Sequence, residues 1–414
     1  MFETQPLSNY LLDSTVGFVG SMSSLFRDEG VPVLRGKNIK PFEIDFEDLK
    51  FINQETHANW RKSQLRAGDV VLVRVGAPGT CCVIPEHLGD LNAASLVILR
   101  TNPKVLDPYF LSVFFNSREG RRQVESLTVG SVQSVFNVKT AHQIQIPVVE
   151  IKEQLAISAM VASINRKIEL NRKSNETLEG IAKALFKSWF VDFDPVRAKA
   201  EGRPTGLPDE ISELFPDSFE ESELGEIPSG WTICPLGELS SISSGKRPTS
   251  VFDSRTPQAP YPLFGGAGIM GYTNESLIEN RLVITTGRVG TLGKFHRIKE
   301  AVWVSDNALI IEPDKSIYHH VLHALLNVDI SAMNRGSTQP LITQKDLKSI
   351  EILKGSVLIH ELFEGLCGGI FNAIDCRGRE SSVLSELRDA LLPRLISGEL
   401  RVPDAEKMLE EVGI

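Results

Sequence analysis

The apolar positions of the chain follow two different periods. In residues 1–150 and again in residues 231–357, the apolar runs are short, rich in β-branched residues and interrupted by glycine, which predicts strands joined by loops. The clearest runs are Val70–Val75, Leu96–Leu99, Arg281–Thr286 and Ala308–Ile311. Short helices are expected at Pro108–Ser117 and Ile317–Leu326. Each stretch is therefore predicted to be an α/β (α+β) domain of mixed strands and short helices.

A helical period follows each of these stretches. Residues 151–190 contain almost no glycine or proline and carry a seam spaced alternately by four and three residues. The seam is Ile157, Val161, Ile164, Ile168, Asn171, Asn175, Leu178, Ala182, Leu185 and Trp189. It predicts a long helix with a seam of roughly 50 Å, which Asp194-Pro195 is expected to end because proline cannot donate the next helical hydrogen bond.

A second seam is expected in residues 358–398, closing near Pro393 and Gly398. Its predicted members are Leu362, Leu366, Gly369, Ala373, Cys376, Val383, Leu387 and Ala390. Two narrow apolar seams can bury each other, so the two helices are predicted to pair as an antiparallel coiled coil. Asn171 and Asn175 then either are buried and fix the register, or face water.

The two domain-like stretches are also a degenerate repeat of each other. Residues 68–79 match residues 281–293, with Arg74 and Gly79 standing 214 positions before Arg288 and Gly293. Gly130-Ser131-Val132-Gln133 stands 206 positions before Gly336-Ser337-Thr338-Gln339. Because the offset shrinks along the chain, we expect a shared framework with loops of different length, and an internal pseudo-twofold repeat.

These patterns divide the 414 residues into consecutive segments. The predicted segments are a first domain (1–150), a central helix (151–192), an acidic linker (193–230), a second domain (231–357), a C-terminal helix (358–398) and a tail (399–414). The net charge of −9 is concentrated around the linker, since residues 191–235 hold eleven acidic residues against three basic ones. Local basic surfaces are therefore compatible with the acidic total.

Composition narrows the class of protein further. The five cysteines are scattered without a C-x-x-C pair, so neither a disulfide framework nor a zinc site is indicated. The beginning of the chain lacks the basic and apolar segments of a signal peptide, and we find no apolar run approaching the roughly 20 residues of a membrane span. A cytoplasmic protein without membrane contact is expected.

Several near matches to catalytic motifs fail on spacing. Gly287–Lys294 is one residue longer than a phosphate-binding P-loop, and Phe264–Gly268 lacks the helix that a methyltransferase cofactor site needs. Asp107-Pro108-Tyr109 lacks the second proline of the amino-methylation motif. His319, His320 and His323 lack the pattern of a zinc protease, so a solvated cluster is favoured over a metal site. We expect no catalytic residue, metal or cofactor.

Two motifs resemble a known family. Residues 171–196, which end in Ala184-Leu185-Phe186-Lys187-Ser188-Trp189-Phe190-Val191-Asp192-Phe193-Asp194-Pro195-Val196, are similar to the central region of specificity subunits of type I restriction-modification systems. Leu391–Leu400 is similar to their C-terminal motif. The resemblance implies two target recognition domains that each read one part of a split double-stranded DNA site, with paired helices between them. It also implies binding of two methyltransferase (M) subunits and of endonuclease/translocase (R) subunits.

The candidate DNA contacts are loop residues whose side chains can bond a base or a phosphate. They are Arg35, Lys37, Asn38, Arg74, Ser131 and Gln133 in the first domain, and Lys246, Arg247, Arg288, Arg335, Ser337 and Gln339 in the second. The matched pairs Arg74/Arg288 and Gln133/Gln339 stand out because each lies near glycine in both halves. A solvated or structural role is the alternative for each. Trp189, Phe190 and Phe193 are the predicted partner-binding anchors.

Two other functions fit parts of the pattern. An enzyme fused to a recognition region would need a further catalytic domain, for which the two halves leave no room in 414 residues. A coiled-coil scaffold that binds only protein would have recognition loops poor in basic residues, and it would not retain DNA of random sequence on a filter.

Overall fold

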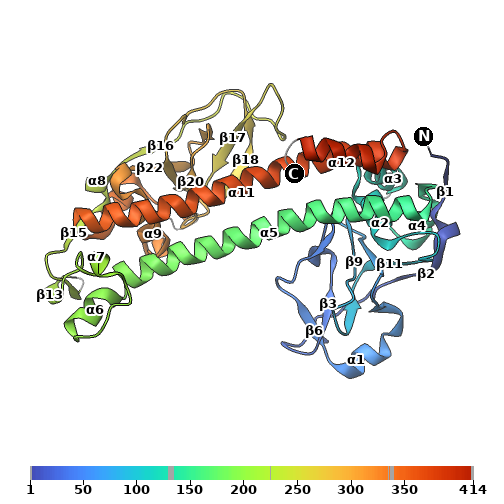
Figure 1. Cartoon of the computed structure of the whole chain (residues 1–414), viewed down its shortest axis with the longest axis horizontal. Helices are drawn as coiled ribbons and strands as arrows, with labels where there is room; N and C mark the ends of the chain where they lie inside the picture. The colour runs from blue at the N-terminus through green and yellow to red at the C-terminus, as the bar shows by residue number, and fades with distance from the viewer. Residues whose placement is uncertain (1, 129–134, 224, 334, 336–339, 412–414) are drawn as a thin grey trace. The chain divides into compact units, whose positions relative to one another are not determined.

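The computed structural model describes residues 2–128, 135–223, 225–333, 335 and 340–411. The chain forms two compact units, each of which contains one strand-rich domain. Unit 1 comprises Met1–Arg172 and Arg377–Ile414, and unit 2 comprises Lys173–Cys376. The two long helices, α5 (Ile151–Phe190) and α11 (Val357–Ser397), each contribute residues to both units (Figure 1).

In unit 1, the principal sheet is antiparallel with the strand order β2-β11-β8-β9 (Leu11–Val16, Leu96–Thr101, Val70–Val73, Cys81–Val83). A second sheet has the order β6-β3-β10-β7 (Lys50–Ile52, Val31–Leu34, Leu91–Ala93, Gln64–Leu65), in which β3 and β10 are parallel. Unit 1 also contains two separate strand pairs, β1-β12 (Thr4–Pro6, Gln145–Pro147) and β4-β5 (Ile39–Lys40, Glu43–Ile44). The shorter α-helices are α1 (Gln54–Asn59), α2 (Pro108–Asn116), α3 (Arg118–Thr128), α4 (Val138–Gln143) and α12 (Val402–Glu411), and the 3-10 turns are η1 (Leu7–Tyr10), η2 (Gly36–Asn38) and η3 (Arg61–Ser63).

Unit 2 repeats this topology. Its principal sheet has the order β16-β22-β19-β20 (Ser240–Ser244, Ala308–Pro313, Val283–Gly287, Phe295–Ile298), and its second sheet has the order β18-β17-β21 (Gly268–Thr273, Tyr261–Gly265, Trp303–Val304). Two pairs are added: β15-β23 (Thr232–Pro235, Glu351–Lys354) and β13-β14 (Phe219–Ser222, Gly225–Pro228). The shorter helices are α6 (Asp194–Ala200), α7 (Asp209–Ser212), α8 (Leu236–Leu239), η4 (Lys315–Ile317), α9 (Tyr318–Leu326), η5 (Ile330–Met333) and α10 (Gln344–Lys348).

The sequence repeat coincides with this structural repeat. Leu7 donates its backbone N–H to the Ile144 carbonyl over 2.8 Å, and Leu236 donates to the Ile350 carbonyl over 2.7 Å. The two donors are 229 positions apart and the two acceptors 206 positions apart, and the second value is the offset found in the sequence before Ile144 and Ile350. The short helices α4 and α10 both begin in reciprocal capping boxes. The predicted strands and the two predicted short helices are all present. The mixed strand-and-helix fold class is therefore confirmed.

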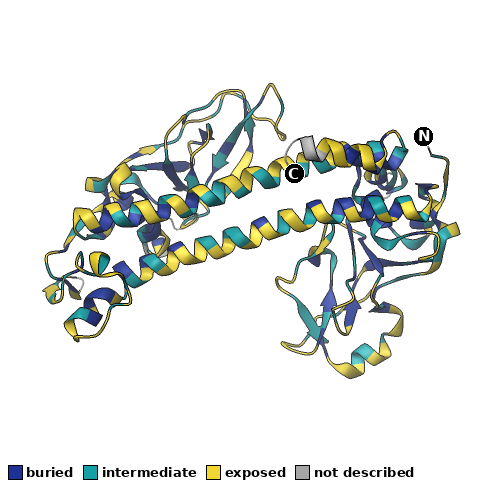
Figure 2. Ribbon diagram, in the orientation of Figure 1, coloured by how far each residue is buried: buried dark blue, intermediate teal, exposed yellow. Residues whose placement is uncertain are grey.

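Each unit has its own apolar core (Figure 2). In unit 1, strands β8 and β11 pack with helix α2, with residues 157–161 of α5 and with residues 391–396 of α11. In unit 2, strands β19 and β22 pack with residues 182–190 of α5 and 359–371 of α11. Burying one large apolar side chain contributes about 1.5–3 kcal/mol, so the long helices are held to each domain by several such side chains.

The predicted seam of α5 is confirmed, because each of its ten members is buried or half-buried. In unit 1, Asn165 accepts a bond from Arg388 and Asn171 donates to Ser381, so the two helix segments run antiparallel. In unit 2, Asn175 lies against the Ile374 carbonyl and Trp189 lies against Phe363, again in antiparallel order.

The predicted seam of α11 is wrong in phase. Leu366 and Val383 are 41% and 51% exposed, whereas Phe363 and Cys367 are fully buried. The buried apolar side chains of the first half are Ile359, Phe363, Cys367 and Phe371, at a spacing of four. This half of α11 packs against helix α9 and strands of unit 2 as well as against α5, so a single narrow stripe does not describe it.

The end of α5 differs by two residues from expectation, whereas α11 ends beside Gly398 as expected. Helix α5 ends at Phe190, before Asp194-Pro195, and Phe193 adopts a left-handed backbone with φ of 57°. Pro195 then occupies the first turn of α6, where its missing N–H is not needed. Helix α11 continues through Pro393 to Ser397, and Gly398 follows with φ of 76°.

Helix α11 is long and apolar enough to cross a membrane by length and composition alone, which the sequence interpretation overlooked. Some of its apolar side chains pack in the cores, namely Phe363 and Cys367 in unit 2 and Leu391 and Leu395 in unit 1, whereas others, such as Leu358 and Leu366, are exposed. Core helices pass the same test of composition.

Candidate nucleic-acid interface

An arginine followed by a glycine-rich turn ends the same strand in both units. In unit 1, Arg74 follows β8 and the turn contains Gly76 and Gly79, with φ of 90° and 83°. In unit 2, residue 288 follows β19 and the glycines at 290 and 293 have φ of 80° and 77°. Left-handed backbone at both positions favours glycine, so the same turn is built twice.

A second segment lies against each arginine turn. Phe136 donates its backbone N–H to the Arg74 carbonyl over 3.0 Å, and Ile342 donates to the Arg288 carbonyl over the same distance. Ser131, Gln133, Ser337 and Gln339 precede these two positions in the sequence but lie outside the described residues. The described backbone therefore brings the ends of these segments next to the arginine turns in both units.

The two arginines differ in their side-chain contacts. Arg74 is half-buried and its Nε donates to the Phe136 carbonyl over 3.3 Å. Arg288 is also half-buried, and its side chain makes no hydrogen bond or ion pair with any residue that the structure describes. Neither arginine is neutralised by a described carboxylate, so both can donate hydrogen bonds to a phosphate or to the edge of a guanine.

The Arg35–Asn38 turn contains a charged cluster. Arg35 and Lys37 both pair with Asp48, which Lys50 also approaches at 3.1 Å. Desolvation and the neighbouring cations Arg35 and Lys50 lower the pKa of Lys37. The cluster is cationic in total and partly exposed.

Asn38 has a structural role within that turn. It is 1% exposed, its Oδ1 accepts from the Arg35 backbone at 3.1 Å, and its Nδ2 donates to the carbonyls of Asp45 and Glu47 at 3.0 Å. Its amide is already bonded inside the protein, which corresponds to the structural alternative left open by the sequence.

The other predicted contacts of unit 2 lie on exposed loops. Lys246 and Arg247 are exposed and make no ion pair within the described part of the chain. Arg335 is 66% exposed and pairs with Asp346 at 2.6 Å. Burial opposes ionisation of Asp346, but hydrogen bonds from Thr343 and Arg335 lower its pKa overall. Arg335 is thus fixed by a carboxylate that also caps α10.

The three predicted partner anchors are core residues. Trp189, Phe190 and Phe193 are 2%, 5% and 9% exposed. The Trp189 ring lies 5.1 Å from Phe215, measured between ring centroids. Buried side chains offer no contact area to another protein, so the structure does not support the direct role predicted for them. The sequence showed the aromatic run but not the core that covers it.

The expected solvated histidine cluster is also buried, which corrects the sequence interpretation. His319, His320 and His323 are 7%, 1% and 3% exposed, and His360 joins them at 4%. Burial lowers the pKa of His323 and of His360 to about 4, and lowers that of His320 well below its usual value. Among the described residues, no group of three or more His, Cys, Asp or Glu is placed to hold a metal ion.

The segments that nearly match catalytic motifs form connections between strands and a helix cap. Gly287–Lys294 connects two antiparallel strands, β19 and β20, instead of leading into a helix. The Phe264–Gly268 segment forms the turn between β17 and β18. Asp107 caps helix α2 by accepting the Phe110 N–H at 2.8 Å.

The chain is similar to proteins of one family. A family model described as type I restriction modification DNA specificity domain matches residues 228–353. The type I restriction enzyme HindI specificity subunit of Haemophilus influenzae is 26% identical, over 82% of this chain and 88% of that protein. The MjaIX specificity subunit of Methanocaldococcus jannaschii is 25% identical, over 71% of this chain and 69% of that protein.

The fold is that of a solved structure. The crystal structure of the type I restriction-modification system S subunit from M. genitalium matches with a TM-score of 0.57 and 16% identity, covering 95% of this chain and 96% of that one. The duplicated domains, the two long helices and these similarities agree. Residues 228–353 match the type I restriction modification DNA specificity domain, and the chain as a whole is similar to specificity subunits of type I restriction-modification systems.

Proposed function

We propose that this chain reads a two-part DNA sequence for a type I restriction-modification complex and directs the methyltransferase and endonuclease subunits to it. The observation that carries the proposal is the duplicated arginine turn, in which Arg74 and Arg288 end equivalent strands with equivalent glycines. Two copies of one binding surface suit a site with two separately read parts.

The proposed division of labour follows the sequence segments. Residues 1–150 and 231–357 each read one part of the site, and the helices of 151–192 and 358–398 set the length of the unread gap. Two linked readers bind together only where the two parts stand at the right separation, which adds specificity without further contacts. The acidic segment 193–230, which contains α6, α7, β13 and β14, connects the halves, and residues 399–414 form the tail.

Within each reader, we assign direct contact to Arg74 and Arg288 first, and to Gln133 and Gln339 second. Arginine can bond guanine in a bidentate manner and glutamine can bond adenine, whereas either can instead hold a phosphate. Lys37, Lys246 and Arg247 are proposed as phosphate contacts, because their ammonium or guanidinium groups are exposed.

The partners in this proposal are double-stranded DNA, two methyltransferase subunits and the endonuclease/translocase subunits, in the cytoplasm. The chain itself catalyses no reaction, since each segment that approaches a catalytic motif forms a turn or a helix cap. Purified chain supplied with S-adenosylmethionine or ATP is expected to show no turnover beyond that of a buffer blank. Turnover that follows the chain through purification would contradict this part of the proposal.

The function is tested by mapping methylated bases in cells that express the chain with its methyltransferase subunits. The expected result is one split sequence, with two short specified parts and an unspecified gap. A continuous recognition sequence would contradict the proposal, and so would a methylation pattern that is unchanged when the chain is omitted.

A further inference from the structure

An open cavity of about 550 Å³ lies in unit 1 beside the loop that follows strand β2. Two segments line it: Val16–Val19, which leaves β2, and Asn59–Ser63, which joins helix α1 to strand β7. The arginine turn at residue 74 is not part of this lining, so the cavity is a separate feature of the domain.

Aromatic rings form one wall of the cavity. The rings of Phe18 and Trp60 are stacked, with centroids 3.8 Å apart and planes 7° from parallel. Both side chains are half-buried, and the neighbouring Val19 is 63% exposed. A half-exposed indole fixed by a parallel neighbour offers an apolar, rigid surface on which a base or sugar can pack.

The charged lining of the cavity is entirely cationic. Arg61 and Lys62 are exposed, and neither makes an ion pair or side-chain hydrogen bond with a residue that the structure describes. No carboxylate occurs among the lining residues, all of which are described. Unpaired cations beside an aromatic face match the phosphate and base of a nucleic acid, and they do not match an apolar or basic partner.

The loop after β2 in unit 1 has a counterpart after β16 in unit 2. Gly17 donates its backbone N–H to Leu96 over 2.8 Å, and Gly245 donates to Ala308 over 3.1 Å, both across the principal sheet. A Cβ at Gly17 or Gly245 would overlap a backbone carbonyl of the neighbouring segment, so the loop is held against the domain in both units.

The residues that follow these glycines are Phe18 and Val19 in unit 1 and Lys246 and Arg247 in unit 2. Phe18 donates its N–H to Ala93 over 2.8 Å, and Lys246 donates to Val304 over 2.9 Å, so they are equivalent in backbone position. Unit 2 therefore places two unpaired cations directly on this loop, whereas unit 1 places an aromatic residue there and supplies its cations from Arg61 and Lys62.

We infer that the cavity formed by Phe18, Trp60, Arg61 and Lys62 binds the DNA duplex at the first part of the target site. Arg61 and Lys62 hold phosphates, and the Trp60 face packs on the sugar or base edge next to them. The inference rests on the proposed function, because it assigns residues to the same DNA-reading domain.

The test uses the chain in complex with its methyltransferase subunits and two duplexes of about 30 base pairs, one carrying the mapped methylation site and one of random sequence. Affinity is measured as a function of salt for Arg61→Ala/Lys62→Ala. The matched control is Lys104→Ala/Lys152→Ala, which removes two exposed cations outside the cavity lining. Trp60→Leu is measured at one salt concentration.

Loss of two phosphate contacts is expected to weaken binding to both duplexes by about tenfold or more and to reduce the slope of log K against log salt by about 2. The control is expected to bind like the wild type. Trp60→Leu is expected to weaken binding to the target duplex, with the complex still assembled. The wild-type slope in Arg61→Ala/Lys62→Ala would overturn the inference, and so would loss of methyltransferase subunits with unchanged DNA affinity.

Different outcomes contradict the cavity assignment and the proposed function. If the wild-type complex prefers the target duplex but the cavity variants bind it like the wild type, the cavity assignment is wrong and the proposed function stands. If the wild-type complex shows no preference for the target duplex, both are wrong.

Discussion

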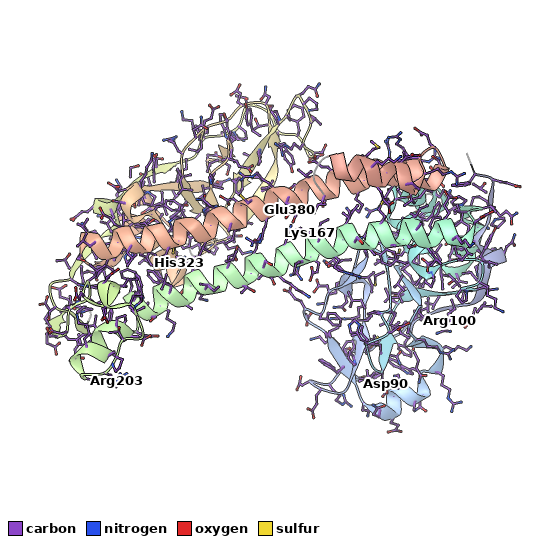
Figure 3. The ribbon with its side chains drawn as sticks, viewed as in Figure 1. Asp90, Arg100, Lys167, Arg203, His323 and Glu380 are labelled. Carbon is purple, nitrogen blue, oxygen red and sulfur yellow. The ribbon has the colours of Figure 1, made fainter. Side chains whose placement is uncertain are left out.

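Asn171 donates its side-chain Nδ2–H to Oε2 of Glu380 over 2.8 Å, from helix α5 to helix α11 within unit 1. Asn171 is only 3% exposed, and Lys167 pairs with the other carboxylate oxygen of Glu380 at 3.1 Å (Figure 3). The hydrogen bond from Asn171 and the charge of Lys167 lower the pKa of Glu380. A buried amide bonded to Glu380 and to the adjacent Ser381 on the facing helix disfavours other registers, since a shift would separate it from both partners.

Replacing this amide tests its role in register. Asn171→Ala should lower the free energy of unfolding of unit 1 by about 1 kcal/mol, because a bond from a buried amide to a partly exposed carboxylate is lost. Asn171→Leu should preserve or raise stability but permit other registers. Denaturant unfolding gives the first quantity, and disulfide trapping between cysteines placed on α5 and α11 gives the second. Trapping of a single register in Asn171→Leu would show that the asparagine does not specify it.

The aromatic core of unit 2 should be sensitive to truncation. Trp189→Ala is expected to reduce the free energy of unfolding of that unit by about 3–5 kcal/mol, since it opens a cavity among packed rings. Ile181→Ala on the same helix is the control, because Ile181 is 50% exposed. Both are followed by denaturant unfolding. Trp189→Ala with wild-type stability but weaker methyltransferase binding would restore the partner-binding role.

The buried histidines predict a loss of stability in acid. His323 and His360 have folded pKa values of about 4 against 6.5 in an exposed state, so below pH 6.5 the unfolded chain binds protons that the folded chain does not. Their contribution is complete above pH 6.5 and declines as the pH falls to about 4. Between pH 7.5 and pH 5 we expect a loss of about 1–2 kcal/mol per histidine.

The variant that isolates this effect is His323→Phe, because the site is surrounded by Phe186, Phe363 and Phe371. It should be as stable as the wild type at pH 7.5, since both ring nitrogens of His323 lack a hydrogen-bond partner in the protein. Urea midpoints at pH 7.5 and pH 5 should differ less in the variant. An unchanged pH dependence would mean that other groups cause it.

The arginine turns should affect the two parts of the target separately. Arg74→Ala is expected to weaken binding by about 1–3 kcal/mol and to relax methylation specificity in one part, and Arg288→Ala in the other. Arg122 and Arg203, which pair with Glu119 and Glu201, supply control substitutions in the two units. Equal weakening on every DNA sequence would assign the arginines to phosphate contacts, and no weakening would remove them from the interface.

Lengthening the helices should lengthen the gap. Seven residues inserted after Arg172 in α5 and after Cys376 in α11 add about 10 Å of helix, or about three base pairs at 3.4 Å each. Both parts of the methylated sequence should persist with a longer gap between them. Two-residue insertions at the same points rotate the following residues by about 200° and should disrupt assembly. An altered half-sequence with the original gap would place the helices within the reading surface.

The repeat made much of the fold accessible from the sequence. Glycine at matched offsets marked turns whose left-handed backbone the structure confirms, as at Gly79 and Gly293. The seam of α5 was predicted correctly because its apolar residues fall on one stripe that is buried along the helix, against domain strands as well as against α11. The phase of α11 was missed because its apolar and small residues occupy several faces, and spacing alone does not reveal that the face of Phe363 and Phe371 is the one packed in the core.

The candidate site was only partly predictable. Arg74 and Arg288 could be found because they repeat, whereas the Phe18–Trp60 stack joins residues 42 positions apart and has no counterpart in the repeat. The side chain of Asn38 has the chemistry of a base contact, but burial and three hydrogen bonds within the protein decide its role. The burial of the aromatic run at Trp189 and of the histidines of α9 was not predicted. The sequence does not show which distant segments pack over these side chains.

The most direct test of two independent readers is an exchange of residues 1–150 for the corresponding segment of a related specificity subunit, followed by mapping of methylated bases. We expect that one part of the split sequence changes to that of the donor, while the other part and the gap stay the same. A change in both parts, or in the gap alone, would contradict it.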